Sequence, residues 1–159
     1  MLLGIGGGYH FSRMRNNLGY FLGLTGLALR GKEVVQCGIA DFYVKREKLQ
    51  ELENAILEHT NESIKVEDIR NLVRKYAEPV ENKYVHEELI NTLFGKDSVE
   101  EIYKELEIAS QSITFAKEML HGMKLMSPVS LKIIFEQIKR GKSLDLKESL
   151  KEDFRMCNQ

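Results

Sequence analysis

The sequence predicts a mainly α-helical protein, and three observations lead to that expectation. Apolar residues recur at helical spacing through most of the 159 residues, for example at Leu49, Leu52 and Ile56. Proline, which interrupts helices, occurs only twice. Only one segment, residues 39–44, has the bulky side chains and the flanking residues that favour a strand.

The first third of the chain predicts short helices and this one strand. Residues 9–24 favour two short helices with a break near Asn16 and Asn17, and Gly26 is placed to end the second. A further short helix is expected over residues 31–37, with its valines facing inward. A strand cannot be stable alone, and no other segment is an obvious partner. We therefore expect the strand to pair with a sheet outside this chain.

From Lys45 onward the pattern is helical throughout. Helices are predicted over residues 49–57, 66–76, 84–94, 99–106, 110–125 and 128–141, and over a last segment that ends the chain. Ser98 is expected to cap one of them, and Ser127 with Pro128 is a typical helix start. We expect Ser143 to cap the last helix.

Composition excludes several classes of function. The 23 basic and 24 acidic side chains leave a net charge of −1, which gives no long-range attraction to nucleic acid or to an anionic membrane. No apolar run approaches the roughly 20 residues that span a bilayer, so we expect no membrane association. Cys37 and Cys157 have no ligand spacing around them, and two reduced thiols are the favoured interpretation.

Both ends of the chain favour a piece of a larger protein. Gly4, Gly6, Gly7 and Gly8 form a turn of a kind that normally joins two elements, and the sequence shows no element before it. The helical stripe at Leu146, Leu150, Phe154 and Cys157 has no Gly, Pro or polar tail after it. The alternative is a small natural domain with frayed ends.

The residues alone give no catalytic or metal-binding constellation. The glycine turn lacks the preceding strand and the Lys-Ser/Thr or G-x-G-x-x-G spacing of a nucleotide loop, which favours a tight turn that feeds a helix. His10 lies beside this turn and is the one histidine with a suggestive position; His59 and His86 are expected to be solvated. No two histidines have helical ligand spacing, so no metal site is expected. Ser12 lacks a G-x-S-x-G context.

The order of several motifs resembles the crotonase superfamily. The glycines with Tyr9, the run from Leu18 to Gly26, and the run from Leu29 to Asp41 follow one another as in those enzymes. The triple glycine followed by Tyr, and the run from Met126 to Ile133, are similar to the 3-hydroxyisobutyryl-CoA hydrolase branch. The resemblance implies an incomplete α/β fold of stacked ββα units with a helical tail. Residues 1–45 would end its core and residues 46–159 would form the helical C-terminal region, as parts of one incomplete domain.

The same resemblance places the expected site residues. Aligned on the triple glycine, the catalytic Glu of the family falls before Met1 and its functional Asp falls at Gly4, so no catalytic residue is expected in this chain. The oxyanion-hole N–H groups of the family come from earlier loops. Gly6, Gly7 and Gly8 would keep a supporting, substrate-binding role beside the acyl pocket.

The implied reaction is hydrolysis of 3-hydroxyisobutyryl-CoA in valine breakdown, in the mitochondrial matrix. The substrate partner would be an acyl-CoA, no separate cofactor is needed because coenzyme A is part of the substrate, and a homo-oligomer is possible. The isolated chain is expected to be inactive. Two alternatives stay open: a non-catalytic helical module that binds a protein partner, and another acyl-CoA hydratase or isomerase.

Overall fold

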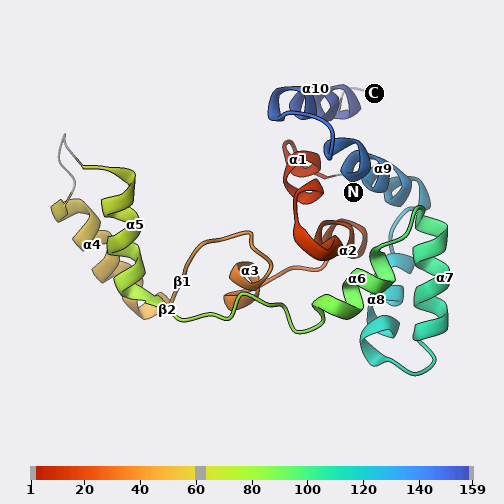
Figure 1. Cartoon of the computed structure of the whole chain (residues 1–159), viewed down its shortest axis with the longest axis horizontal. Coiled ribbons are helices and arrows are strands. Elements are labelled where there is room, and N and C mark those ends of the chain that lie inside the picture. The colour runs from red at the N-terminus through yellow and green to blue at the C-terminus, as the bar shows by residue number, and fades with distance from the viewer. Residues whose placement is uncertain (1–2, 60–63, 158–159) are drawn as a thin grey trace. The chain divides into compact units, whose positions relative to one another are not determined.

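The computed structural model describes residues 3–59 and 64–157, and within that part the chain is mainly helical with one small sheet (Figure 1). The α-helices are α1 (Gly7–Ser12), α2 (Leu18–Thr25), α3 (Lys32–Gln36), α4 (Leu49–His59), α5 (Val66–Tyr76), α6 (Glu87–Phe94), α7 (Val99–Ala109), α8 (Thr114–Lys124), α9 (Pro128–Gly141) and α10 (Leu146–Cys157). Two short 3-10 helices are η1 (Arg15–Asn17) and η2 (Arg46–Lys48). The mainly helical prediction is confirmed.

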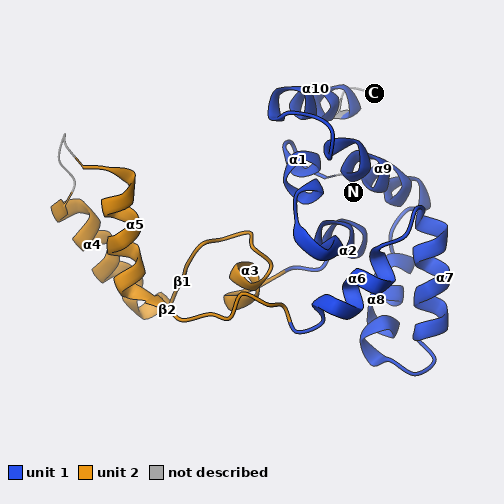
Figure 2. Ribbon diagram, viewed as in Figure 1, with its two compact units in different colours: residues 1–28, 85–159 blue, residues 29–84 orange. Residues whose placement is uncertain are grey.

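The chain divides into two compact units, which Figure 2 colours separately. One unit joins Met1–Ala28 to Val85–Gln159, and the other is Leu29–Tyr84. The first unit is therefore built from two stretches of chain that the second unit separates in sequence. The boundary expected at residue 45 stays a prediction.

Helix α2 lies at the centre of the first unit. Every residue from Leu18 to Leu24 is buried, and the helix packs against α1, α6, α8 and α9. A helix that is apolar on all sides is expected in a core, and this segment carries no charged residue. Fully buried side chains around it are Phe94, Ile90, Ile102, Leu106, Met123, Ile134 and Ile138.

The predicted break between α1 and α2 is confirmed at Asn16 and Asn17. Both have positive φ, 49° and 59°, which asparagine tolerates better than most residues. The Asn16 amide donates to Glu87 Oε1 at 2.6 Å, and Arg15 Nε donates to the same oxygen at 2.7 Å. Because Glu87 is 4% exposed, these hydrogen bonds compensate the burial of its charge and tie the break to α6. Gly26 ends α2 with φ 65°, as expected.

The second unit contains a helical hairpin and the sheet. Helices α4 and α5 pack together through Leu52, Ala55 and Leu72. Strand β1 (Tyr43–Val44) pairs antiparallel with β2 (Ala77–Glu78). The expectation that the strand pairs outside this chain was therefore wrong, and the strand covers two residues of the six expected.

Two further expectations were wrong in detail. Helix α10 is capped by Asp145, whose Oδ1 accepts the Glu148 N–H at 2.8 Å, while the Ser143 hydroxyl donates to Arg140 O. Asp145 stands immediately before Leu146, the first residue of α10, which is the position from which a side chain caps a helix. His86 is half-buried, with its ring centroid 4.2 Å from that of Phe115, and is not a solvated side chain. Ser98 caps α7 as predicted, accepting the Glu101 N–H at 3.2 Å.

Candidate functional site

The glycine turn is a tight turn that feeds α1. The Gly7 N–H donates to Gly4 O at 2.8 Å, and the His10 N–H donates to Gly6 O at 3.1 Å. Gly6 has φ 85°, a conformation that side chains with a Cβ rarely adopt. The predicted tight turn into a helix is thus present.

A buried carboxylate from the far end of the chain holds this turn. Asp153 on α10 is 2% exposed, and its Oδ2 accepts the Gly6 N–H at 2.7 Å. Its Oδ1 accepts the Gln137 Nε2–H at 2.5 Å, which links the carboxylate to α9. Hydrogen bonds to a charged acceptor are stronger than neutral ones, and these two compensate the burial of Asp153. The carboxylate therefore connects the turn, α9 and α10.

Close backbone contact fixes the turn against α9. A Cβ added at Gly141 would collide with Gly8 O, and one added at Gly8 would lie 3.1 Å from Gln137 Cγ. Arg13, which follows α1, also binds the end of α9. Its Nη1 donates to Gly141 O at 2.9 Å, and its Nη2 donates to Leu144 O at 2.7 Å. The glycines at these two positions are needed because the two backbones approach so closely.

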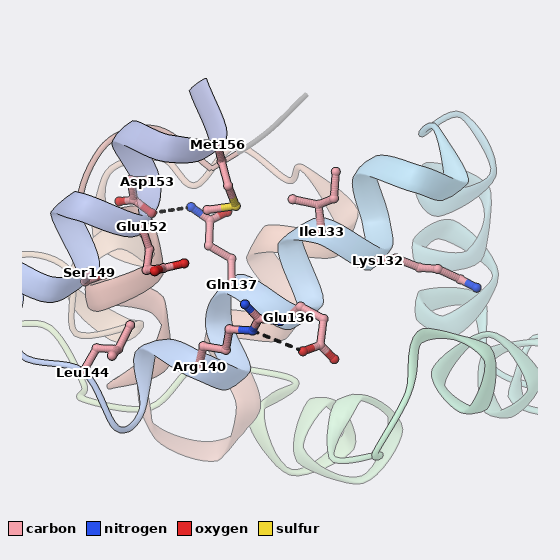
Figure 3. Close-up of a pocket in the computed structure, with 10 residues that line it drawn as sticks. All are labelled: Lys132, Ile133, Glu136, Gln137, Arg140, Leu144, Ser149, Glu152, Asp153 and Met156. Atoms are coloured by element: carbon pink, nitrogen blue, oxygen red, sulfur yellow. Dashed lines mark hydrogen bonds and ion pairs between the residues drawn. The ribbon is translucent and has the colours of Figure 1, made fainter. Parts of the chain in front are cut away.

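A cavity of about 290 Å³ lies between α9 and α10, next to this contact (Figure 3). Apolar side chains share its wall with charged ones at the rim. The lining residues are Lys132, Ile133, Glu136, Gln137, Arg140, Leu144, Ser149, Glu152, Asp153 and Met156. Figure 3 shows the Gln137 amide with its nitrogen toward Asp153 and Met156 beside its other end.

The Gln137 oxygen is the notable polar atom of this cavity. Oε1 is buried and has no hydrogen-bond partner among the described residues. A buried acceptor without a donor is costly, by about 1–3 kcal/mol. The cavity can therefore accommodate a hydrogen-bond donor, from water or from a bound molecule, at this atom.

The structure separates the predicted site residues from this cavity. Gly8 is buried and Gly6 and Gly7 are half-buried beside Asp153 and Gln137, but none of the three lines the cavity. His10 is exposed, and the Ser12 hydroxyl donates to Tyr9 O at 2.9 Å. Gly4 is exposed. The substrate-binding role of the glycines stays a prediction.

Sequence reasoning missed Asp153 and Gln137. Asp153 stands in the run Lys151-Glu152-Asp153, which is typical of a solvated helix face. The sequence nevertheless contained a signal for the burial of Asp153. Ser149 lies four residues earlier, on the same face of the helix, and its side chain is small and uncharged. Both Ser149 and Asp153 are buried.

The expectation that this chain carries no catalytic residue stays a prediction. Within residues 3–59 and 64–157 no group of three or more His, Cys, Asp or Glu side chains could hold a metal ion. No helix in the described part of the chain has the length and apolar character needed to cross a membrane. What the arrangement provides is a tight turn, held by a buried carboxyl group, beside a partly apolar cavity.

Comparison with known proteins gives the family. A model described as enoyl-CoA hydratase/isomerase matches residues 3–159. The protein from Dictyostelium discoideum named "3-hydroxyisobutyryl-CoA hydrolase, mitochondrial" is 37% identical over 158 residues, which covers 96% of this chain and 40% of that relative. Proteins of the same name from Xenopus laevis and Homo sapiens are 38% identical over 157 residues and 37% identical over 161 residues, with the same shares covered.

The chain thus spans about 40% of the length of the curated relatives it matches. The family match covers nearly every described residue, including the glycine turn and the α10 helix that holds it. The resemblance identified from the glycine and Met-Ser-Pro motifs is confirmed. The chain belongs to the enoyl-CoA hydratase/isomerase family.

Proposed function

We propose that this chain contributes to hydrolysis of an acyl-CoA thioester, with 3-hydroxyisobutyryl-CoA as substrate and 3-hydroxyisobutyrate and coenzyme A as products. The observation that carries the proposal is the 37% identity to the relative named 3-hydroxyisobutyryl-CoA hydrolase across 96% of this chain. The names of these relatives include the word mitochondrial, which supports a mitochondrial location. The family resemblance implies valine breakdown in the matrix of that organelle.

Within this reaction the glycine turn has a supporting role. Gly6, Gly7 and Gly8 would form part of the wall beside the acyl group, and Asp153 would keep that wall in place through the Gly6 N–H. A turn held by a buried hydrogen bond can stay in position while a substrate binds.

The chain by itself would not catalyse the reaction. The resemblance implies a catalytic Glu from a segment of the family that this match does not include, and it places the functional Asp of the family at Gly4. Each oxyanion-hole donor of such a site contributes roughly 2.7–4 kcal/mol to transition-state stabilisation. Without the Glu and those donors, turnover by the isolated chain should be at background.

A thioesterase assay tests both parts of the proposal. Release of coenzyme A from 3-hydroxyisobutyryl-CoA is read with a thiol reagent, with the full-length Dictyostelium discoideum relative as control. The chain is assayed alone, and again after co-expression with the part of that relative that lies outside the match. We expect background release of coenzyme A from the chain alone and measurable release from the co-expressed pair. The release from the pair should be lost when the chain carries Gly8→Val.

Two results would contradict the proposal. Turnover by the chain alone within about tenfold of the control would mean that its own carboxylates do the chemistry. A purified complex of the two parts that releases no coenzyme A would argue against the hydrolase role.

A second candidate function is a non-catalytic module that binds a protein partner. It is favoured by the large apolar side chains that α10 exposes, since apolar groups gathered on one exposed face indicate an interaction site. Co-elution of the chain with a full-length relative on size exclusion would support this function, and separate elution at every concentration would contradict it.

A further inference from the structure

Helix α10 presents two parallel stripes of side chains to solvent. Leu146, Leu150 and Phe154 are 49%, 37% and 66% exposed, and they recur every four residues along one face. Lys147, Lys151 and Arg155 follow each of them by one position, and all three are exposed. These six residues together line a depression on the surface of the helix.

The side of α10 that adjoins the apolar stripe is turned toward the protein. Ser149 and Asp153 are buried there, and Asp153 holds the Gly6 N–H and the Gln137 amide. Helix α10 therefore binds its own unit through polar contacts, while the apolar stripe beside these contacts stays partly exposed.

The apolar surface extends beyond α10 onto the glycine turn. A Cβ built at Gly6 would lie 4.0 Å from the Leu150 side chain, and the preceding residue, Ile5, is 71% exposed. The glycine turn thus lies on one side of the apolar stripe. The side chains of Lys147, Lys151 and Arg155 lie on its other side.

The width of the apolar stripe indicates whether a helix or a membrane surface would bind it. At about 100° per residue, Leu146, Leu150 and Phe154 span roughly 80° of the helix circumference. A stripe this narrow is typical of a seam between two helices, whereas insertion into a membrane surface uses a broader apolar face.

The charged side chains beside the apolar stripe indicate which charge a binding partner would carry. Lys147, Lys151 and Arg155 lie beside the seam on its exposed side, and Glu148 and Glu152 lie farther round the helix, with Glu152 paired to Arg155 at 3.0 Å. We propose that this face, defined by Ile5, Leu146, Leu150, Phe154 and the three cations, binds an acidic amphipathic helix of a partner protein. The proposal rests on the second candidate function and specifies its partner chemistry.

A peptide titration of the full chain tests the proposal. The probe is a fluorescent peptide of about 18 residues, long enough to form a helix, with leucine at every third or fourth position and glutamate elsewhere. Controls are a peptide with the same leucines and lysine in place of glutamate, and a scrambled acidic peptide. We expect Kd on the order of 10⁻⁵ M for the acidic helix, weaker at high salt, and no saturable binding of either control.

Three variants make the test specific to this face. Phe154→Ala should weaken binding about tenfold. Combined Lys147→Glu and Lys151→Glu should abolish binding of the acidic helix and favour the lysine peptide. Leu57→Ala, which removes a side chain that is 68% exposed on α4, is the matched control and should leave binding unchanged. The far-UV circular dichroism of each variant checks that it folds.

Each alternative outcome overturns the proposal. Binding of the chain to phosphatidylserine vesicles with no binding of the peptide would identify a membrane surface as the occupant. No peptide binding, or equal binding by the charge-reversed variant, would show that the face does not select an acidic helix. If the peptide fails while the chain co-elutes with a full-length relative, the partner chemistry is wrong and the second candidate function stands.

Discussion

Helices α9 and α10 both contact the glycine turn, but different forces attach them. Helix α9 buries Leu131, Ile134, Phe135 and Ile138 and brings Gly141 against the Gly8 backbone. Over residues 146–156, where burial is described, helix α10 buries no large apolar side chain; its buried residues there are Ser149 and Asp153. The difference teaches that α9 is part of the core, while α10 is held by a small number of directional hydrogen bonds.

The largest effect should come from the core contact of α9. Ile134 is 0% exposed, so Ile134→Ala leaves a cavity and should lower the free energy of unfolding by about 2–5 kcal/mol. Leu146→Ala on α10 is the control and should change it by less than about 0.5 kcal/mol, because that side chain is 49% exposed. Urea denaturation followed by circular dichroism measures both. Equal losses would show that the stripe of α10 is packed in solution.

The next effect should come from the carboxylate of α10. Asp153→Ala leaves the Gly6 N–H and the Gln137 amide without their acceptor and should cost about 2–3 kcal/mol. Asp153→Asn keeps one acceptor and should cost less. Hydrogen exchange at the Gly6 amide is the specific readout, since it should accelerate in both variants. Unchanged exchange at Gly6 would mean that the carboxylate does not hold the turn.

Gly141→Ala tests the close approach of α9 to the turn. The new Cβ collides with Gly8 O, which should cost about 1–3 kcal/mol. Gly122→Ala in α8 is a matched control, because its Cβ would lie 3.4 Å from Thr25 O and alanine favours a helix by up to about 1 kcal/mol. Thermal unfolding of the two variants should therefore shift in opposite directions. A stabilised Gly141→Ala protein would exclude the close contact.

The smallest effect should come from the exposed ion pair on α10. Arg155 Nη1 lies 3.0 Å from Glu152 Oε1, with the arginine 72% exposed. Replacing either residue with alanine should cost about 0.3–0.5 kcal/mol, as for other exposed pairs. A double-mutant cycle in urea isolates the coupling, which should vanish at high salt. Coupling above about 1 kcal/mol would indicate that the pair is shielded from water.

The sequence predicted most helices because their periods are local. The break at Asn16 and Asn17, the Ser98 cap and the Ser127-Pro128 start all depend on neighbours within a few residues, and all are present. The error at Ser143 was also local, since Asp145 was an equally visible candidate.

Contacts between residues far apart in the sequence could not be predicted from local patterns. Strand β2 is two residues long and carries no alternating pattern, so nothing in the sequence marked it as the partner of β1. For the candidate site, the glycine turn was found from its residue types, but the burial of Asp153 depends on Gly6 and Gln137. A charged side chain in a charged helix shows its role only when the fold places a donor against it.

The hydrogen bond between Gly6 and Asp153 also has a consequence for the order of folding. A ribosome makes the glycine turn 147 residues before its carboxylate acceptor, so the turn cannot reach its final form until Asp153 has been synthesised. The Leu29–Tyr84 unit, whose contacts are continuous in sequence, can fold in the meantime. Closing a contact over so many residues is slow, and the nascent segment that carries the turn would stay exposed to chaperones and proteases until Asp153 leaves the ribosome.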